Sequence, residues 1–452
     1  MNIIIVGAGL VGVNLAKHLS NEQHNVTLID SNHFLVKRVQ ESLDVQVLEG
    51  DATDGHILKS AGLDSADLVL AVSNSDESNL IIALMARAIN GSVKIVARVK
   101  RQQYLNSPWH GNPMGETVLF SPDQAAVEMI EELLSVDQSF EVVPFEHGAI
   151  RVAGFILGEG STLVGKPLKD IRLLAEVRAL IVAVDRKGEL FIPDGHSILQ
   201  PLDRIYITLI AETELNKILA TIGIKTTKKH KIVIAGGGWK GEQIARSLEK
   251  TGIQVFLLDK DLERCNALAD QLKETHVLFA DATDPEILQD LLGNTSTFLA
   301  LTNHQEVNFL LCLQARQYMN AEFSRTIALV DNDAYLSMAH GLGIDAVVSP
   351  RLAAVGNILR FLGKGKVIDA APLLNGRLEA FSLEVQPNSR LAGVCLKDLR
   401  LPAGIIVAGG IKNGAVVVPN GNLAFTAGDH LLIISFRGHI KQLDDYLSVE
   451  SA

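Results

Sequence analysis

The sequence predicts an α/β protein with two doubly wound parallel sheets, each followed by a small, hairpin-rich α+β domain. Three observations indicate this fold class. Short apolar runs alternate with helical patterns, two glycine-rich turns each connect such a run to a helix, and the whole order of segments occurs twice in the 452 residues. Continuous apolar strands separated by helices are typical of parallel sheets that are covered on both faces.

An internal repeat organises the chain. The segment "IIIVGAGLVGVNLA" at residues 3–16 matches "IVIAGGGWKGEQIA" at residues 232–245, and "GDATDGHILKSAG" matches "ADATDPEILQDLLG". The match continues through "VLAVSNSDESNL" and "FLALTNHQEVNF", and through "FSPDQAAVEMIEELL" and "VSPRLAAVGNILRFL". Because a repeat of this kind reflects a repeated structural unit, residues 1–135 and 230–364 are predicted to be two copies of one domain.

Six apolar runs predict the strands of the first copy. They read "IIIV", "VTLID", "VQVLEG", "LVLAV", "KIVARV" and "TVLFS". In a doubly wound sheet the ligand binds beyond the carboxyl ends of the strands. The residues that follow each run are therefore the first candidates for a binding site.

A smaller repeated unit follows each copy. The segment "STLVGKPLKDIR" at residues 161–172 matches "SRLAGVCLKDLR" at residues 389–400. We place the two small domains at residues 140–224 and 368–450, and we expect the charged segment "KKHK" at 228–231 to separate the halves of the chain. Apolar alternation in these domains is broken by dipeptides that favour tight hairpins: Lys187-Gly188, Asp194-Gly195, Asn413-Gly414 and Asn420-Gly421.

The first glycine-rich turn has the spacing of a dinucleotide-binding fingerprint. Gly7 permits the tight turn, Gly9 lets the backbone approach a pyrophosphate, and Gly12 lets the helix lie against the strand. Peptide N–H groups at the helix start can hold the anion without lysines. Asp30 comes 18 residues after Gly12, where its carboxylate would accept hydrogen bonds from ribose hydroxyls and repel a 2′-phosphate. We therefore predict a Rossmann-like domain that favours NAD over NADP.

The second copy keeps the glycine spacing and the aspartate but differs within the turn. Trp239 and Lys240 fill the middle of its turn, and Leu329 stands where the first copy has Arg98. A glycine-rich turn without a ligand is the alternative interpretation for both copies. The predicted cofactor-binding residues are Gly7, Ala8, Gly9, Leu10, Val11, Gly12, Asp30, Asp51, Ala52, Ser73, Asn74 and Arg98, and in the second copy Gly236, Gly237, Gly238, Trp239, Lys240, Gly241, Asp259, Asp281, Ala282, Thr302 and Asn303.

Several of these residues have two interpretations. Arg98 ends the fifth predicted strand, so its guanidinium could reach the phosphates, or it could form a surface ion pair. Asp51 with Ala52 and Ser73 with Asn74 follow the third and fourth strands. They could contact the ligand or could simply form turns.

Composition excludes several classes of protein. The formal net charge of −11 and the lack of a basic stripe argue against nucleic acid as a partner, because nucleic acid is held mainly by clustered Lys and Arg. The three cysteines are far apart in the sequence, which favours neither disulfides nor a zinc site. The histidines do not fall into a metal-binding spacing. We predict no metal site and no catalytic residue.

Two segments resemble functional motifs without completing them. In "GSTLVGKP" at residues 160–167, Pro167 replaces the Ser or Thr that a phosphate-binding P-loop requires, so a strand-to-helix turn is expected. Asp64, Asp67, Asp76 and Glu77 could suggest a paired-carboxylate or divalent-ion site, but we expect solvated loop charges there.

These motifs together carry a family resemblance. The chain resembles the cytoplasmic gating subunit of Trk-type potassium uptake systems, a peripheral protein built from tandem regulator-of-potassium-conductance (RCK) units. The resemblance covers nearly all of the chain: both glycine turns with their aspartates, both "DATD" segments, "LAVSNSDESN" with "LALTNHQEVN", and "LKDIR" with "LKDLR".

The resemblance implies a function. It implies that NAD(H), and ATP or ADP, bind in the Rossmann-like units, and that four chains assemble into a ring of eight units under a membrane potassium channel or transporter subunit. It also implies a cytoplasmic protein, peripheral at the inner face of the membrane, that controls potassium flow and is not an enzyme. The helices at residues 122–134 and 351–362 could form contacts between units or could pack on their own sheets.

Two other functions stay open at this point. An NAD-dependent oxidoreductase would need a proton donor over the nicotinamide. In the small domains Lys169 and Lys397 recur, but each belongs to a "KD" helical turn and is not placed to act as such a donor. A nucleotide sensor that acts without a channel shares every sequence feature with the gating subunit.

Overall fold

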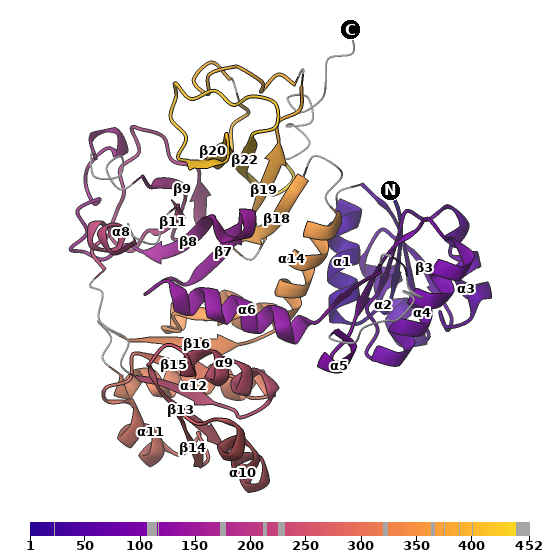
Figure 1. The fold of residues 1–452 in the computed structure, drawn as a ribbon, viewed down its shortest axis with the longest axis horizontal. Coiled ribbons are helices and arrows are strands. Elements are labelled where there is room, and N and C mark those ends of the chain that lie inside the picture. The colour runs from indigo at the N-terminus through magenta and orange to yellow at the C-terminus, as the bar shows by residue number, and fades with distance from the viewer. Residues whose placement is uncertain are drawn as a thin grey trace. The chain divides into compact units, whose positions relative to one another are not determined.

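The computed structural model forms two compact units (Figure 1). The first contains residues 1–125 and 350–358, and the second contains residues 126–349 and 359–452. The structure describes the chain except for residues 22, 106–114, 116, 172–177, 211–214, 225–230, 320–323, 363–366, 375, 388, 400 and 440–452. Most of the segment predicted to separate the halves, and the end of the second small domain, therefore lie outside the described residues. The four domain boundaries stay predictions.

The first unit contains a six-stranded parallel sheet in the order β3-β2-β1-β4-β5-β6. Its strands are β1 (Asn2–Val6), β2 (Asn25–Asp30), β3 (Gln46–Glu49), β4 (Leu68–Ala71), β5 (Lys94–Arg98) and β6 (Thr117–Phe120). All six predicted strands are confirmed. The strand order reverses between β1 and β4, which makes the crevice above these two strands the expected ligand position.

Helices flank this sheet because every strand of its centre is apolar on both faces (Figure 1). They are α1 (Leu10–Asn21), α2 (His33–Ser42), α3 (Gly55–Ser60), α4 (Asp76–Ile89) and α5 (Gln102–Leu105). Asn32 begins α2 by accepting hydrogen bonds from two backbone N–H groups, and Ser75 begins α4 by accepting one from the Ser78 N–H. Such N-terminal caps satisfy N–H groups that have no partner within the helix.

The second unit repeats this sheet in the order β14-β13-β12-β15-β16-β17. Its strands are β12 (Lys231–Ala235), β13 (Gln254–Asp259), β14 (Thr275–Phe279), β15 (Thr297–Ala300), β16 (Arg325–Leu329) and β17 (Ala346–Val348). The helices are α9 (Trp239–Glu249), α10 (Leu262–Gln271), α11 (Pro285–Leu292), α12 (Gln305–Tyr318) and α13 (Asp333–Met338). The predicted fold class of two Rossmann-like sheets is confirmed.

Each small domain contains a five-stranded antiparallel sheet. The first has the order β10-β9-β11-β8-β7 and the second has the order β18-β19-β22-β20-β21. The strands are β7 (Glu141–Phe145), β8 (Ile150–Ile156), β9 (Leu180–Arg186), β10 (Glu189–Phe191), β11 (Arg204–Leu209), β18 (Val367–Leu373), β19 (Leu378–Glu384), β20 (Ile405–Lys412), β21 (Ala415–Val417) and β22 (His430–Phe436). Helix α8 (Leu215–Thr221) follows the first sheet.

Two of the four predicted hairpin turns are confirmed. Lys187-Gly188 joins β9 to β10 and Asn413-Gly414 joins β20 to β21, with positive φ at all four residues, as a two-residue hairpin requires. The other two dipeptides do not join paired strands. Gly195 and Gly421 instead offer their carbonyl oxygens to the backbone N–H groups of the lysines in the two "KD" turns. A Cβ atom on Gly195 or Gly421 would lie only 3.3 Å from the Cβ of Lys169 or Lys397, and this close approach favours glycine at both positions.

The two small sheets contact each other through acidic side chains of the first sheet. The Leu374 N–H donates to Glu141 at 3.1 Å, and Arg377 donates to Asp185 at 3.3 Å. Glu146 accepts a hydrogen bond from Ser382, and its other oxygen lies 2.9 Å from His430 Nδ1. Burial raises the pKa of Glu141. The first sheet thus supplies the acceptors and the second supplies the donors.

The helix between the first large sheet and the first small sheet belongs to both units. Helix α6 (Pro122–Ser135) starts in the first unit, but from Ala126 onward it is part of the second. Ile130 and Leu133 of α6 lie in the same apolar core as Ile327 of β16. Helix α14 (Pro350–Leu362) shows the converse arrangement, since residues 350–358 belong to the first unit. For α6, a shared core with the other copy is therefore observed.

A buried arginine holds the end of α6. Arg325 begins β16 and is 2% exposed. Its guanidinium donates to the carbonyl oxygens of Leu133, Val136 and Ser139 at 2.6, 3.1 and 3.2 Å. A cation is favourable at a helix C-terminus, where the carbonyl groups carry partial negative charge. Burial lowers the pKa of Arg325 to about 10, which leaves it charged at neutral pH.

In the part of the chain that the structure describes, none of the helices combines the length and the apolar character needed to cross a membrane.

Arg325→Met should destabilise the second unit, because three buried carbonyl oxygens lose a charged donor. A hydrogen bond to a charged group contributes about 1.5 to 3 kcal/mol to the free energy of unfolding. The thermal unfolding midpoint measured by calorimetry should therefore fall clearly. Lys94→Met is the matched control, since Lys94 begins β5 as Arg325 begins β16 but is exposed. Equal midpoints for the two variants would contradict the role given to Arg325.

Candidate functional site

The first glycine turn depends on close backbone contacts. Gly7 has a φ of 112°, and a Cβ atom on it would lie 2.9 Å from the backbone N of Ser73. A Cβ on Gly12 would lie 1.8 Å from the Gly7 carbonyl oxygen. Only glycine fits at either position. The contacts hold β1, α1 and the end of β4 together at one point.

Gly9 has a different environment. A Cβ atom added to Gly9 would meet no described atom within 4 Å. The protein's own packing therefore does not require glycine here. Open space beside a backbone that begins a helix is the geometry that lets peptide N–H groups approach an anion.

The second turn has the same geometry. Gly236 has a φ of 110°, and a Cβ on Gly241 would lie 2.0 Å from the Gly236 carbonyl oxygen. A Cβ on Gly238 would meet no described atom within 4 Å. Gly237 is tighter than its counterpart Ala8, since a Cβ would lie 2.7 Å from a Leu268 methyl group. In both turns the first and third glycines are therefore tightly packed, and the glycine that precedes the helix borders open space.

Both predicted aspartates end the second strand of their sheet and hold the glycine turn. One Asp30 oxygen accepts the Ala8 N–H at 2.6 Å, and the other accepts the Asn32 N–H at 2.8 Å. Asp259 accepts the Gly237 and Asp261 N–H groups at 2.7 and 2.9 Å in the same way. A carboxylate offers about four acceptor positions, so two ribose hydroxyls could bind as well.

The residues inside the turns begin the helices. Leu10 is the first residue of α1 and is 64% exposed, whereas Val11 is buried. In the second copy Trp239 takes the place of Leu10 and packs partly buried against the core of the unit. Trp239 is thus a packing residue at the helix start, and Lys240 follows it on the first turn of α9.

Two buried asparagines that the motifs did not identify organise the carboxyl ends of the next strands. Asn79 accepts the Ser73 N–H and donates to the carbonyl oxygens of Ser73 and Arg98. Asn308 makes the equivalent bonds with Thr302 and Leu329. Each side chain accepts through its amide oxygen and donates through its NH₂ group. An ionised aspartate can only accept, so it could not replace the asparagine. In the sequence, Asn79 and Asn308 stand at matching places in the two repeated segments, and this repeated asparagine could have indicated the shared role.

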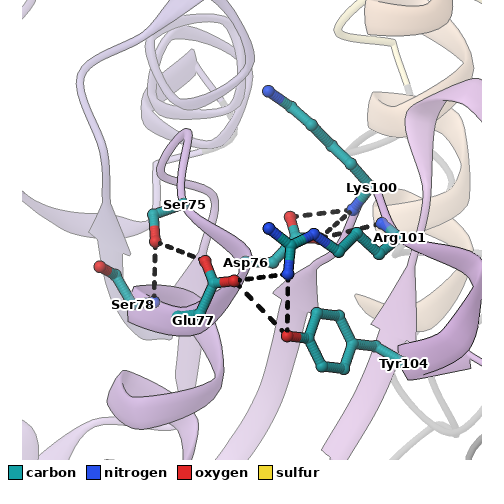
Figure 2. A network of polar contacts seen from close by, with 7 residues as sticks. All are labelled: Ser75, Asp76, Glu77, Ser78, Lys100, Arg101 and Tyr104. Atoms are coloured by element: carbon teal, nitrogen blue, oxygen red, sulfur yellow. Dashed lines mark hydrogen bonds and ion pairs between the residues drawn. The ribbon is translucent and has the colours of Figure 1, made fainter.

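Asp76 is a structural residue and not a solvated charge. It is 6% exposed and accepts the backbone N–H groups of Lys100 and Arg101 at 2.9 to 3.0 Å. Figure 2 shows that it reaches the loop after β5, while the Lys100 side chain extends away from it. The expectation for Asp76 is therefore wrong, because backbone donors compensate the buried charge. Gln305 serves the same purpose in the second copy with its amide oxygen.

Glu77 fits the expectation of an exposed charge. It lies 2.9 Å from the Arg101 guanidinium, and Tyr104 lies at the edge of the same contact (Figure 2). Half-exposed pairs of this kind contribute little to stability. Among the described residues no group of three or more His, Cys, Asp and Glu side chains is arranged to hold a metal ion.

Arg98 lies at the predicted position at the end of β5. Its guanidinium donates to Asn74 Oδ1 at 3.3 Å, so it extends across the carboxyl edge from β5 toward β4. Leu329 at the matching position of the second copy is 7% exposed and apolar. A cation is therefore present at this edge of the first sheet and is replaced by core packing in the second.

The "DATD" segments form turns in both copies. Asp51 accepts the N–H and hydroxyl of Thr53, and these bonds lower the pKa of Asp51. Asp281 makes the same bonds with Thr283. Ala52 is buried, and Ala282 is partly buried. The turn-forming role of these residues is thus observed, and their contact with a ligand stays a prediction.

A charged trio lies on the second turn alone. Arg264 donates from Nε to the Gly237 carbonyl oxygen at 2.7 Å and from Nη2 to Glu242 at 2.7 Å. Arg246 donates to the other Glu242 oxygen at 2.9 Å. The first copy has Leu35, Val13 and Lys17 at the three matching positions. A comparison of the copies beyond the glycines could have found this difference.

The P-loop-like segment lies in the first small domain. Gly165 has a φ of 78°, and the chain then enters a short 3-10 helix at Leu168–Asp170. Lys166 is exposed. The three cysteines are free thiols, of which Cys265 and Cys312 are buried and Cys395 is partly buried.

Family comparisons match both repeated units. The TrkA-N domain family matches residues 3–107 and 232–350, and the TrkA-C domain family matches residues 152–218 and 381–448. The Trk system potassium uptake protein TrkA of Azorhizobium caulinodans is 31% identical, and the alignment covers 99% of each chain. This chain belongs to the TrkA family.

Other TrkA proteins show the same extent of similarity. The Archaeoglobus fulgidus homolog is 30% identical over 98% of this chain and 99% of its own, and the Halomonas elongata protein is 28% identical over 96% and 95%. Among solved structures, the GsuK RCK domain has a TM-score of 0.58 at 19% identity and covers 99% of this chain and 94% of that one. The TrkA-type chain therefore has the RCK fold.

Asn79→Asp should destabilise the first unit more at high pH than at low pH. The new carboxylate would face two carbonyl oxygens, so its pKa would be raised in the folded state. The folded state then binds more protons than the unfolded state, and stability falls as pH rises. We expect a lower unfolding midpoint than wild type at about pH 8 and a partial recovery at about pH 5.

The control for this experiment is Asn90→Asp. Asn90 also donates to two carbonyl oxygens, those of Leu63 and Ala66, but it lies at the other end of α4. Both variants should be less stable than wild type. Only Asn79→Asp should also lower the affinity for a ligand that binds at the carboxyl ends of the strands. The same midpoint for Asn79→Asp at both pH values would contradict the bonding assigned to it.

Proposed function

We propose that this chain is a regulatory subunit of a Trk potassium uptake system that binds NAD(H) at its first glycine turn. The observation that carries the proposal is the open position at Gly9 beside a carboxylate at Asp30 that keeps acceptor capacity. ATP or ADP is the second ligand class, because the same turn would hold any adenosine diphosphate group. A solved GsuK channel structure with a TM-score of 0.59 is described as bound to NAD.

Occupancy would act on an assembly and not on a bond-forming step. In this proposal four chains form a ring of eight Rossmann-like units next to a membrane potassium channel or transporter subunit, at the inner face of the membrane. A ligand can favour one ring shape only if it binds that shape more tightly. A coupling free energy of about 1 to 3 kcal/mol is typical of such regulation.

The relatives favour this function over the two alternatives. TrkA proteins along the full length of this chain are named as potassium uptake proteins. An NAD-dependent oxidoreductase would turn over nicotinamide cofactor with simple alcohols and acids, which an assay of the purified chain measures. A sensor that acts without a channel would leave potassium uptake by membrane vesicles unchanged when the chain is added.

Gly9→Val should abolish nucleotide binding at the first turn while leaving the unit folded. The new side chain enters open space, so it meets no packing conflict but blocks the approach of a phosphate to the backbone. Gly91→Val is the matched control, since a Cβ at Gly91 also meets no described atom within 4 Å. Titration calorimetry with NADH and ADP measures both. Wild-type affinity of Gly9→Val would contradict the proposed phosphate position.

Asp30→Asn should weaken NADH binding and the potassium response together. The amide keeps one oxygen but loses the charge that strengthens hydrogen bonds to ribose hydroxyls, so affinity should fall by about tenfold or more. Asp64→Asn, an exposed carboxylate away from the turn, is the control. Reduced binding with an unchanged potassium response would separate the ligand from the regulation and refute that link.

A further inference from the structure

The two small sheets meet through ionisable side chains, many of them buried. We call the facing surfaces of these sheets, with their adjoining turns, the small-sheet contact. Protein interiors hold such groups only where they are paired or neutralised, so the strength of this contact depends on which of them carry a proton. The ionisable side chains that face it are Glu141, Glu146, Asp185, Arg204 and Tyr206 from the first small domain, and Asp369, Arg377, Glu384 and His430 from the second.

Glu141 forms one part of the small-sheet contact. Its carboxyl group accepts hydrogen bonds from the Tyr206 hydroxyl of its own sheet and from the Leu374 N–H of the second small domain. Burial raises the pKa of Glu141, and neither these two bonds nor the charge of Arg204 offsets it. Tyr206 stays a neutral donor, since burial raises the pKa of its hydroxyl as well. Because the second domain lies directly against this carboxyl group, the closed contact favours its protonated form.

The pair of Glu146 and His430 forms another part. Glu146 accepts from Ser382 at one oxygen, and its other oxygen lies 2.9 Å from His430 Nδ1. The Glu146 side chain is 5% exposed and that of His430 is 31% exposed, so water reaches the imidazole. Glu384 is directly opposite His430 on β19 and adds a second carboxyl group there. A carboxylate attracts a protonated imidazole much more than a neutral one, so the closed contact favours the protonated form here too.

The internal repeat shows that the fold does not require this pair. Glu146 has a φ of 51° in the turn between β7 and β8, and Leu374 has a φ of 50° in the matching turn between β18 and β19. Arg204 begins β11 where His430 begins β22. Equivalent backbone positions therefore accept an apolar residue in place of the acid and a permanent cation in place of the imidazole.

We propose that the small-sheet contact is pH-sensitive, becoming tighter as pH falls and looser as pH rises, with Glu141 and the Glu146–His430 pair as the groups that titrate. Both bind a proton more strongly when the sheets are together than when they are apart, so their effects have the same sign. The inference goes beyond the proposed function, since it requires no nucleotide.

The sign of the effect sets the pH range. The contribution of Glu141 is complete below the ordinary glutamate pKa of about 4.3 and is lost as pH rises through its raised value. An ordinary histidine side chain titrates near pH 6.5, at about the middle of the physiological range. The Glu146–His430 pair therefore extends the response toward neutral pH.

Hydrogen exchange measured by mass spectrometry on the full chain reports this contact, because the Leu374 N–H is one of its hydrogen bonds. Protection of a peptide that contains Leu374, corrected for the intrinsic pH dependence of exchange, should fall by about tenfold between about pH 6 and about pH 8, as a pKa difference of one unit between the closed and open forms would produce. The turn at Asn413-Gly414 is the internal control, since the Asn413 N–H is bound by Asp429 of its own domain. Its corrected protection should stay the same.

Substitutions assign the effect to particular groups. His430→Arg introduces the residue type of the first copy, keeps a cation at every pH and should retain protection at about pH 8. His430→Gln and Glu146→Leu should have low protection at both pH values, whereas Glu141→Gln, which resembles the protonated acid, should reduce the loss at high pH. His196→Gln replaces an exposed histidine of the first small domain beside Lys169 and is the matched control, which should behave as wild type.

Two results would overturn the inference. One is equal corrected protection of the wild-type Leu374 peptide at both pH values, and the other is the same pH dependence in His430→Arg as in wild type. Thermal unfolding at low pH checks that each variant is folded, and His430→Arg keeps the test decisive even where His430→Gln fails to fold. Because exchange is measured without nucleotide or membrane subunit, this inference can fail while the proposed function stands, and nucleotide titration can fail independently of it.

Discussion

The contact between the backbone of Gly7 and the helix at Gly12 is the constraint on which the candidate site depends. A single methyl group at Gly12 would overlap the carbonyl oxygen of Gly7, so the helix and the strand can be this close only where both residues are glycine. The closeness aims the first N–H groups of α1 at the carboxyl edge of the sheet. Asp30 then fixes the turn by accepting the Ala8 N–H. Because Gly236, Gly241 and Asp259 repeat each of these contacts, the second turn has the same shape, whatever it binds.

Around this shared frame the two copies diverge in their side chains. Asn79 and Asn308 hold the ends of the next strands identically, and Asp76 and Gln305 reach the same backbone with different chemistry. A frame built from backbone contacts leaves the surrounding side chains free to change. Arg98 lies at the first site alone and Arg264 at the second alone. This arrangement explains how one duplicated fold can offer two chemically distinct sites.

The second unit brings together α6, the second large sheet and both small sheets. Arg325 holds the carboxyl end of α6 from β16, and the acidic side chains of the first small sheet accept hydrogen bonds from the second. These contacts link residues that are about two hundred positions or more apart in the chain. The second glycine turn and both small sheets therefore belong to one compact unit.

The sequence by itself determined the strands, the duplication and the two turns, because apolar runs, glycine spacing and a repeat of 229 positions between Gly7 and Gly236 are all local patterns. It also placed Asp30, Asp259 and Arg98 at the ends of their strands. Only the tertiary structure decided that α6 packs into the second unit, that Asp76 is buried against backbone N–H groups, and that Arg264 lies on the second turn. The physical reason is that these features depend on which distant groups meet in space. A buried charge and an exposed one look the same in a sequence until their partners are known.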